Sequence, residues 1–241
     1  MKNKKILVVG HTGYADSIYG LGEITARVSE FMQNPDKFSL ILFTGGEDVH
    51  PSLYNDTSPH HICQAYIARD HREMVIYERA AKNKVLMTGI CRGLQFLNVM
   101  DGGKMIHHLD SHAGVSHRML THEGEIIRVN SLHHQMILPK KSAIITGVTP
   151  YKLSPEYIGA NDTIFKYEGN EIEAAIFPEI MSFGVQYHPE MMPTHSDGYK
   201  YYYDMVKFAL SNPWDRFITE YDTNKIRLRN SLSTVQQATS A

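Results

Sequence analysis

One cysteine of this 241-residue chain stands where backbone geometry favours a reactive thiolate. Cys91 lies at the centre of Gly89-Ile-Cys-Arg-Gly93, after a short apolar run and before Leu94, Leu97 and Met100 at helical spacing. A thiol at the start of a helix faces unpaired backbone N–H groups and the positive end of the helix dipole. Gly-x-Cys-x-Gly alone leaves two interpretations open, a nucleophile or a buried structural cysteine.

A histidine and a glutamate two residues apart supply the groups that such a nucleophile needs. His188 and Glu190 end the segment Gly184-Val-Gln-Tyr-His-Pro-Glu190, where alternate side chains of a strand point to one side. An imidazole oriented by a carboxylate takes a proton from the thiol and later returns one to a leaving amine. Either residue alone is an ordinary surface group, but the pair together with Cys91 indicates nucleophilic catalysis.

A glycine pair follows another apolar run. Gly45 and Gly46 lie in Thr44-Gly-Gly-Glu-Asp-Val-His-Pro51, and they free backbone N–H groups to face a ligand. Together with the N–H of Arg92, directly after the cysteine, these donors would stabilise a tetrahedral oxyanion. A Gly-Gly pair is also an ordinary turn, so the segment alone is not decisive.

Four segments occur in an order, and at gaps, that are typical of one enzyme superfamily. They are Thr44–Tyr54, Gly89–Val99, Val129–Gln135 (Val-Asn-Ser-Leu-His-His-Gln) and Gly184–Glu190. In these segments the chain resembles the class I glutamine amidotransferase superfamily. Within it, the chain looks most like the γ-glutamyl hydrolase branch, which includes the γ-glutamyl-γ-aminobutyrate hydrolases. The resemblance covers about residues 40–192.

The resemblance implies a fold and a set of catalytic roles. The implied fold class is α/β, a flavodoxin-like three-layer sandwich with a mainly parallel central sheet and a small β-rich insertion. Cys91, His188 and Glu190 are implied as a catalytic triad that forms a glutamyl thioester. The backbone N–H groups of Gly46 and Arg92 are implied as the oxyanion hole.

The resemblance also implies a subsite for the glutamyl group of the substrate. Its residues are Gly45, Gln95, His133, His134 and Gln135. Gln95 and the His-His-Gln loop are expected to hold the α-amino and α-carboxylate groups. Gln95 is four residues after the cysteine and therefore on the same helical face.

Three departures from the family pattern affect substrate identity. The stretch Gly10–Phe38 has room for about one helix, where the family has a further strand–helix unit, and Gly103–Asn130 is short. Thr44 stands where a proline is common. We expect that the wall that selects the leaving group differs, so the sequence does not name the amine.

Composition excludes several other classes of protein. Lys and Arg number 24 against 26 Asp and Glu, a net charge of -2, which gives no basic field for nucleic acid. No apolar run approaches the roughly 20 residues of a membrane span, and two cysteines cannot form a disulfide scaffold. We expect a cytoplasmic enzyme with a small-molecule substrate that binds neither nucleic acid nor membranes.

The 14 histidines raise the question of a metal site. One group contains His107, His108, His112, His117 and His122, and another contains His60, His61 and Cys63. Neither has the paired spacing of a known zinc motif, and the resemblance assigns His133 and His134 to substrate. We therefore expect no metal and no cofactor.

Helical patterns and composition suggest the organisation of the chain. We expect helices over Glu23–Met32, from a capping box at Asp70–Glu73, and from a cap at Asp197. Residues 1–213 would form the catalytic domain and residues 214–241 a C-terminal extension, of which Ser231–Ala241 is expected to be disordered. Trp214, Phe217 and Tyr221 recur at i, i+3 and i+7, which favours a short packed helix over a partner-docking patch.

Three functions are compatible with these residues. The first is a hydrolase that cleaves the γ-glutamyl amide bond of glutamine or of a γ-glutamyl amine by itself. The second is a glutaminase subunit that delivers ammonia to a separate synthase partner, and the third is a catalytically inactive binding module. The Cys-Arg-Gly and Asn-Ser-x-His-His-Gln segments favour the first, while the intact triad argues against the third. The sequence leaves a homo-oligomer open.

Overall fold

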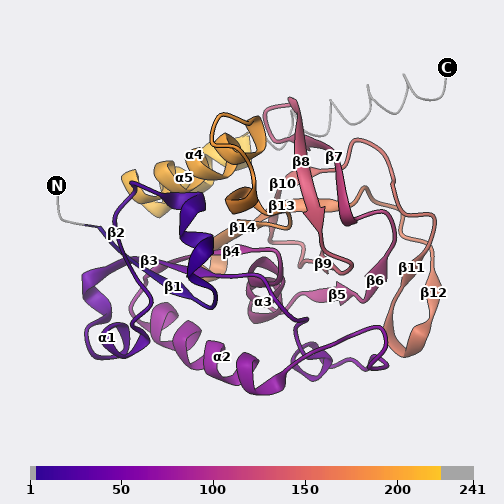
Figure 1. Ribbon diagram of the computed structural model, residues 1–241, viewed down its shortest axis with the longest axis horizontal. Helices are drawn as coiled ribbons and strands as arrows, with labels where there is room; N and C mark the ends of the chain where they lie inside the picture. The colour runs from indigo at the N-terminus through magenta and orange to yellow at the C-terminus, as the bar shows by residue number, and fades with distance from the viewer. Residues whose placement is uncertain (1–3, 224–241) are drawn as a thin grey trace.

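The computed structural model describes residues 4–223, and a nine-stranded sheet forms its centre (Figure 1). The strand order is β2-β1-β3-β4-β14-β13-β10-β7-β8. The bounds are β1 Lys5–Val9, β2 Glu23–Thr25, β3 Phe38–Phe43, β4 Leu86–Ile90, β7 Ala113–Thr121, β8 Ile126–Leu132, β10 Ile144–Val148, β13 Ile172–Phe177 and β14 Ser182–Val185. Strands β2, β1, β3, β4 and β14 run parallel, and the rest extend the sheet antiparallel.

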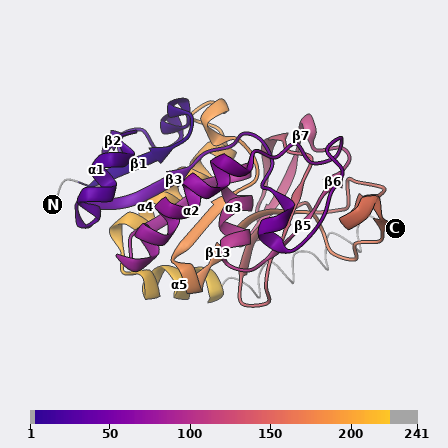
Figure 2. The same cartoon turned by 90° about the horizontal axis from the view of Figure 1, so that it is seen from below.

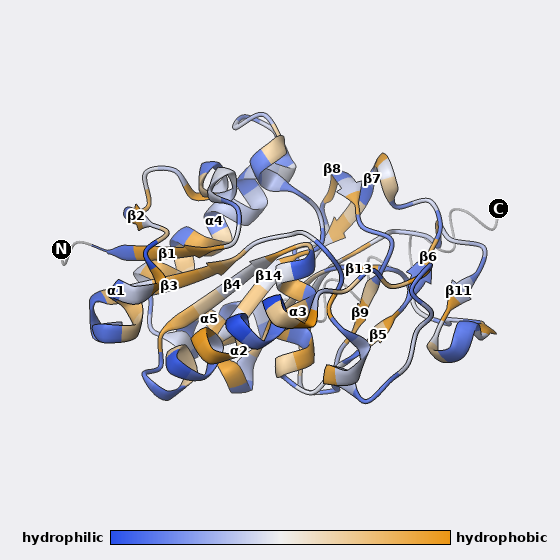
Figure 3. Ribbon diagram, turned by 60° about the horizontal axis from the view of Figure 1, so that its bottom comes forward, coloured by the Kyte–Doolittle hydropathy of each residue, from blue (hydrophilic) through white to orange (hydrophobic). Residues whose placement is uncertain are grey.

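Helices cover both faces of this sheet and make three layers (Figure 2). They are α1 Val28–Gln33, α2 Ile67–Lys82, α3 Arg92–Met100, α4 Asp197–Ser211 and α5 Trp214–Thr223. Successive residues of β1 alternate between two cores: Leu7 packs with α1, α2 and α3, and Ile6 packs with α4 and α5. The strands between the helix layers are accordingly the most hydrophobic segments (Figure 3).

A β-rich insertion separates α3 from β13, as the sequence predicted. Besides β7, β8 and β10 it contains two small sheets. One pairs β5 Lys104–Ile106 with β9 Met136–Leu138, and the other joins β6 His108–Leu109, β11 Tyr157–Ile158 and β12 Ile164–Phe165. The predicted α/β class with a mainly parallel central sheet is confirmed.

Two of the expected helix starts are wrong. The helix predicted over Glu23–Met32 is the edge strand β2 followed by the shorter α1, because β2 pairs in register with β1. Helix α2 already begins at Ile67, so Asp70 does not cap it. Asp70 and Glu73 are instead buried and bind the guanidinium of Arg92.

The cap of α4 is displaced by one residue from the expectation. Ser196, not Asp197, is the capping residue, since its Oγ accepts a hydrogen bond from the N–H of Tyr199 at 3.3 Å. Asp197 is the first helical residue, where its charge still favours the helix dipole.

Helix α5 packs on the rest of the fold. Phe217 and Tyr221 are buried, with the Phe217 ring centroid 5.2 Å from that of Phe183 on β14. The indole N–H of Trp214 donates to the carbonyl of Pro178 at 3.2 Å. The packed-helix interpretation of this stripe is confirmed, whereas Ser231–Ala241 lies outside the described residues. A domain division after residue 213 stays a prediction.

None of the helices within residues 4–223 combines the length and the apolar character that crossing a membrane requires.

Candidate active site

Three predicted segments meet at one edge of the sheet. Strands β3, β4 and β14 are neighbours that run parallel, so their carboxyl ends lie together. Gly45 and Gly46 follow β3, Cys91 follows β4, and His188 follows β14. The carboxyl edge of a parallel sheet is where open α/β folds bind their ligands.

Cys91 occupies a strained turn between β4 and α3. Its backbone has φ 53° and ψ −115°, a left-handed conformation that a non-glycine residue seldom adopts. Its N–H donates to the carbonyl of Val185 at 2.8 Å, while its own carbonyl accepts from the N–H of Gln95 at 3.1 Å. The thiol is therefore fixed at the N-terminus of a helix, next to N–H groups that lack an i−4 partner.

Glycines allow α3 to pack against β3, and β14 against β4, backbone to backbone behind the cysteine. A Cβ atom on Gly184 would overlap the carbonyl oxygen of Gly89, and one on Gly93 would overlap that of Phe43. These close approaches fix the distance between the turn that holds Cys91 and the strand that leads to the histidine.

His188 is oriented by a carboxylate and by an amide. Its Nδ1 lies 2.7 Å from Oε1 of Glu190, and both side chains are almost fully buried. The side chain of Asn130 accepts from the N–H of His188 at 2.8 Å and donates to its carbonyl at 2.9 Å. Since Nδ1 donates to Glu190, Nε2 is the nitrogen left for the thiol.

The electrostatics of this pair favour an imidazolium. Burial lowers the pKa of His188, but hydrogen bonds with Cys91 and Glu190 outweigh burial and raise that pKa to about 10. A protonated imidazole beside a thiol stabilises the thiolate, which is the nucleophilic form.

Arg69 on α2 holds the glycine pair. One of its terminal nitrogens donates to the carbonyls of Thr44 at 3.1 Å and Gly45 at 2.9 Å, and the other pairs with Glu47 at 2.9 Å. In a trans peptide the N–H points opposite to the C=O. The contact to the Gly45 carbonyl therefore turns the N–H of Gly46 away from Arg69.

Gly46 has no room for a side chain. Its φ is +139°, and a Cβ atom there would overlap the guanidinium of Arg69. Glycine at this position lets the arginine reach the carbonyls behind the loop.

Tyr14 is a site residue that the sequence did not single out. It lies in the 3₁₀ segment Thr12–Ile18, and its hydroxyl is 3.5 Å from Nδ1 of His188. Burial raises the pKa of Tyr14 well above its usual range, so the phenol stays neutral. Arg69 and Asn130 were also missed, although Asn130 falls in one of the four recognised segments. The position of Asn130 in that segment was the available signal for it, whereas the sequence around Tyr14 offered no signal.

The side chain of Arg92 points toward α2. It is buried and forms ion pairs with both Asp70 and Glu73 of α2. Its backbone N–H lies at the first position of α3, where it has no partner within the helix, and its oxyanion role stays a prediction.

The residues of the predicted glutamyl subsite do not all face one cleft in the structure. Of its residues, His134 lines a cleft of about 570 Å³, together with Gly46 of the predicted oxyanion hole, and Nε2 of His134 lies 3.1 Å from Asp48. The carbonyl of Gly45 accepts from Arg69. Gln95 is buried beneath and donates to the backbone carbonyl of Gln135 at 3.1 Å. The side chain of His133 faces Glu173 instead of the cleft, because the strand end after β8 directs successive side chains to opposite sides.

The sequence of this chain is similar to those of known proteins. The family model described as Peptidase C26 matches residues 23–125, which include the glycine pair and Cys91. Protein NtpR of Enterococcus hirae is 29% identical over 67% of this chain and 70% of that protein. The YvdE homologue of Lactococcus lactis subsp. cremoris, a glutamine amidotransferase-like protein, is 30% identical over 47% of this chain and 69% of its own length.

Solved structures share the fold at low sequence identity. A candidate GMP synthase component from Thermoplasma acidophilum has a TM-score of 0.54 at 15% identity, over 91% of this chain and 99% of that chain. The curated relatives that match are covered over 36% to 70% of their own length.

Proposed function

Because this chain belongs to the class I glutamine amidotransferase superfamily, a group of amide-hydrolysing enzymes, we propose that it cleaves γ-glutamyl amide bonds through a glutamyl thioester. The observation that carries the proposal is the meeting of Cys91 with His188 and Glu190 beside the N–H groups of Gly46 and Arg92. The substrate is glutamine or a γ-glutamyl amine.

In the first half-reaction the Cys91 thiolate attacks the carbonyl carbon of the side-chain amide. The carbonyl oxygen becomes an oxyanion, and the N–H groups of Gly46 and Arg92 donate to it. Imidazolium His188 then protonates the amine from Nε2, the C–N bond breaks, and a glutamyl thioester remains on the sulfur. Glu190 keeps the imidazole in the tautomer and orientation that this transfer needs.

In the second half-reaction His188, now neutral, takes a proton from water. The resulting hydroxide attacks the thioester carbonyl, and the same two N–H groups stabilise the second oxyanion. The C–S bond breaks, glutamate leaves, and the thiolate–imidazolium pair is restored.

Arg69 acts in this scheme as a positioning residue. It does not contact the scissile bond, but it fixes the peptide whose N–H would stabilise the oxyanion. A flip of the Gly45–Gly46 peptide would present a carbonyl instead of a donor, and Arg69 opposes that flip through a charge-assisted hydrogen bond.

The cleft beside the glycine pair supports a leaving group larger than ammonia. Its volume of about 570 Å³ lies next to Gly46, and the histidines His61, His108 and His134 line it. A polar amine would fit such a wall. Because His134 is also expected to hold the glutamyl group, the cleft would contain that group together with a polar amine. Room for both parts of such a substrate favours a hydrolase that acts by itself.

A glutaminase subunit is the second candidate. The similar fold of the candidate GMP synthase component from Thermoplasma acidophilum is the observation that favours it. In that case ammonia would be delivered to a separate synthase partner, and the isolated chain would hydrolyse glutamine slowly.

Steady-state kinetics on a panel of γ-glutamyl amides, with glutamine included and no partner present, separate the candidates. We expect kcat/KM for a bulky amide to exceed that for glutamine by about tenfold or more. Mass spectrometry of the quenched enzyme should detect a glutamyl group on Cys91. If every amide is inert until a second protein is added, the ammonia-delivery function is correct. If neither condition gives turnover by the folded protein, the proposal fails and a binding module remains.

A further inference from the structure

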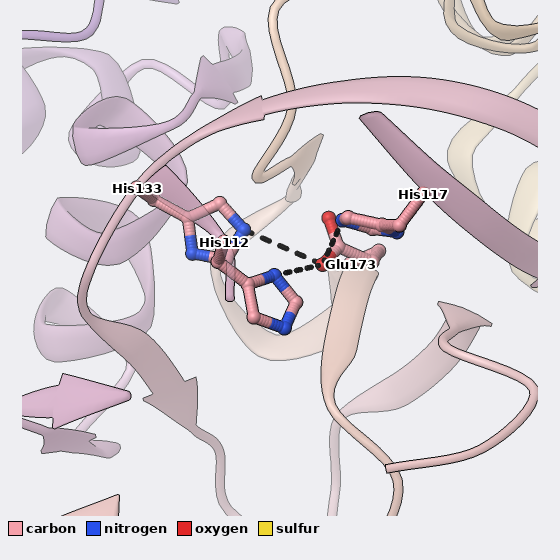
Figure 4. A group of neighbouring side chains, drawn as sticks. All are labelled: His112, His117, His133 and Glu173. Carbon is pink, nitrogen blue, oxygen red and sulfur yellow. Dashed lines mark ion pairs between the residues drawn. The ribbon is translucent and has the colours of Figure 1, made fainter. Parts of the chain in front are cut away.

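Four buried side chains with metal-binding atoms converge in the antiparallel half of the sheet (Figure 4). His112 precedes β7, His117 lies on β7, His133 follows β8, and Glu173 lies on β13. Each side chain is at least nine-tenths buried. The grouping of histidines by sequence neighbours therefore missed this set, since its members come from three separate segments.

Three of the distances within the cluster are those of a tetrahedral coordination shell. Nδ1 of His112, Nε2 of His117 and Nε2 of His133 each lie 3.3 Å from Oε1 of Glu173. All four donor atoms lie within 4.8 Å of one another. Ligands that surround a zinc ion tetrahedrally at about 2.0–2.1 Å are separated by about 3.4 Å. Three edges of the cluster thus already have the required length.

The tautomers of two histidines leave lone pairs facing the carboxylate. Nδ1 of His117 lies 3.1 Å from the carbonyl of Arg118, and Nδ1 of His133 lies 2.9 Å from the carbonyl of Gln135. A carbonyl only accepts, so each ring carries its hydrogen on Nδ1. In the neutral rings both Nε2 atoms then point a lone pair at Glu173.

A buried carboxylate that faces nitrogen lone pairs is repelled unless positive charge lies between them. Within residues 4–223 the three imidazole nitrogens contact Oε1 of Glu173 at 3.3 Å, but neither carboxylate oxygen accepts a hydrogen bond of regular geometry. Protons on all three imidazoles would bury three cations against one anion, and such uncompensated charge is costly. A single divalent cation would instead be coordinated by all three imidazole nitrogens and by the carboxylate oxygen. Metal-bound imidazoles also usually donate their other N–H to a carbonyl or carboxylate, as His117 and His133 do.

We propose that His112, His117, His133 and Glu173 bind one divalent transition metal ion, which their ligand chemistry identifies as zinc. Three imidazoles and a carboxylate suit zinc, and four protein ligands make a closed structural site. The site ties β7 and β13 to the loop that continues with His134 and Gln135. The ion would therefore hold one wall of the cleft in place without taking part in bond breaking.

This inference replaces the expectation of a metal-free protein, and it does not depend on the proposed reaction. The full chain is stripped with a chelator, supplied with zinc, passed over a desalting column and analysed by mass spectrometry for metal content. We expect about one zinc ion per chain and a rise in Tm on reloading. Cobalt(II) added to the stripped protein should give the intense visible absorption of a tetrahedral site.

Variants test the identity of the ligands. Glu173→Gln and His117→Ala should each weaken zinc binding by more than the roughly 100-fold that loss of an outer hydrogen-bond partner costs. His107→Gln is the matched control, because His107 is a buried histidine that contacts Asp56 outside the cluster. This variant should keep its zinc.

Two outcomes would overturn the proposal. One is a stripped, folded wild-type chain that takes up no zinc and whose Tm does not respond to the metal. The other is full zinc content in both ligand variants, which would place the ion elsewhere. The wild-type measurements need no substitution, so they decide the question even if a variant fails to fold.

Discussion

Two polar clusters occupy different parts of the central sheet and are built in opposite ways. The cluster at the carboxyl ends of β3, β4 and β14 consists of loop residues, has a strained Cys91, and pairs its histidine with a carboxylate through a short hydrogen bond. The cluster between β7 and β13 is enclosed by strands, and its carboxylate contacts three imidazole nitrogens at 3.3 Å without a hydrogen bond of regular geometry.

The contrast shows what each kind of chemistry demands of a fold. A nucleophile needs access and a backbone that projects it, which turns at strand ends supply. A structural ion needs rigid donors and exclusion of water, which strands inside a sheet supply. Gln186 connects the two regions, because its buried side chain lies between Gln95 and His133 and its backbone leads to His188.

The largest expected effect falls on the strand-end cluster. Cys91→Ala should lower turnover by several orders of magnitude, as loss of a catalytic nucleophile does, because no other described thiol lies near a base. The fold should survive, since Ala is small enough for the same turn. Amide hydrolysis and Tm are the two measurements, and wild-type turnover in this variant would refute the mechanism.

Cys63→Ser is the control for that substitution. The Cys63 thiol is buried, and burial raises its pKa to about 12, so it is a poor nucleophile. Activity should stay close to that of the wild type. A large loss of kcat without a loss of Tm would mean that the second thiol participates.

Glu190→Gln should lower kcat by roughly 10² to 10⁴, the range seen when the orienting acid of a triad becomes an amide. It should also move the pH profile. The carboxylate helps to raise the pKa of His188 to about 10, and only protonated His188 can donate to the leaving amine. Without that charge the pKa falls, so the alkaline limb of kcat/KM should shift to lower pH. An unchanged limb would show that another group sets it.

Arg69→Gln should lower kcat by roughly 10- to 1000-fold, approaching the cost of losing an oxyanion donor, while KM changes little. The matched control is Arg72→Gln, three residues along the same helix and exposed to solvent. That variant should behave as the wild type does. Equal losses in both variants, or a loss confined to KM, would contradict a positioning role for Arg69.

Among the substitutions expected to lower activity, Gln95→Ala should have the smallest effect, and it probes the connection between the two regions. It removes the donor to the Gln135 carbonyl, and a buried hydrogen bond is worth roughly 1–2 kcal/mol. We expect kcat/KM to fall about tenfold, alike for glutamine and for a bulky amide, because the family resemblance assigns Gln95 to the glutamyl side of the site. A change in the ratio of the two substrates would instead place Gln95 near the leaving group.

The sequence predicted the strand-end cluster because its residues stand in short segments. Cys91 and Arg92 are adjacent, as are Gly45 and Gly46, and each set directly follows an apolar run. The residue types and the family resemblance joined these segments into one site, and the structure shows that their strands are parallel neighbours whose carboxyl ends meet.

The residues that support this cluster could not be predicted in the same way. Tyr14 and Arg69 reach the site from a 3₁₀ segment and from the first turn of a helix, and no local pattern distinguishes them from surface residues. Asp70 and Glu73 resembled a capping box, but their burial with Arg92 depends on how α2 packs against α3.

The histidine–glutamate cluster was missed for a related reason. Whether His117 on β7 and Glu173 on β13 lie close together depends on how both strands pair with β10. That pairing is antiparallel and includes register shifts. Sequence spacing identifies metal ligands only where two of them share a turn or a helix. Here His112 and His117 are the only pair from one segment, and the other donors arrive through long-range pairing.

The glycine contacts behind Cys91 determine which substitutions the enzyme tolerates. Gly93 and Gly184 carry no functional group, but a single methyl at either would overlap a carbonyl oxygen of a neighbouring strand. No other residue is a conservative replacement at these positions, because every other side chain adds a Cβ atom. In a randomised library selected for hydrolysis, variants at both positions should therefore be depleted about as strongly as variants of the nucleophile itself. The depletion should exceed that at most large core residues, because a core residue can often be replaced by another hydrophobic residue of similar volume.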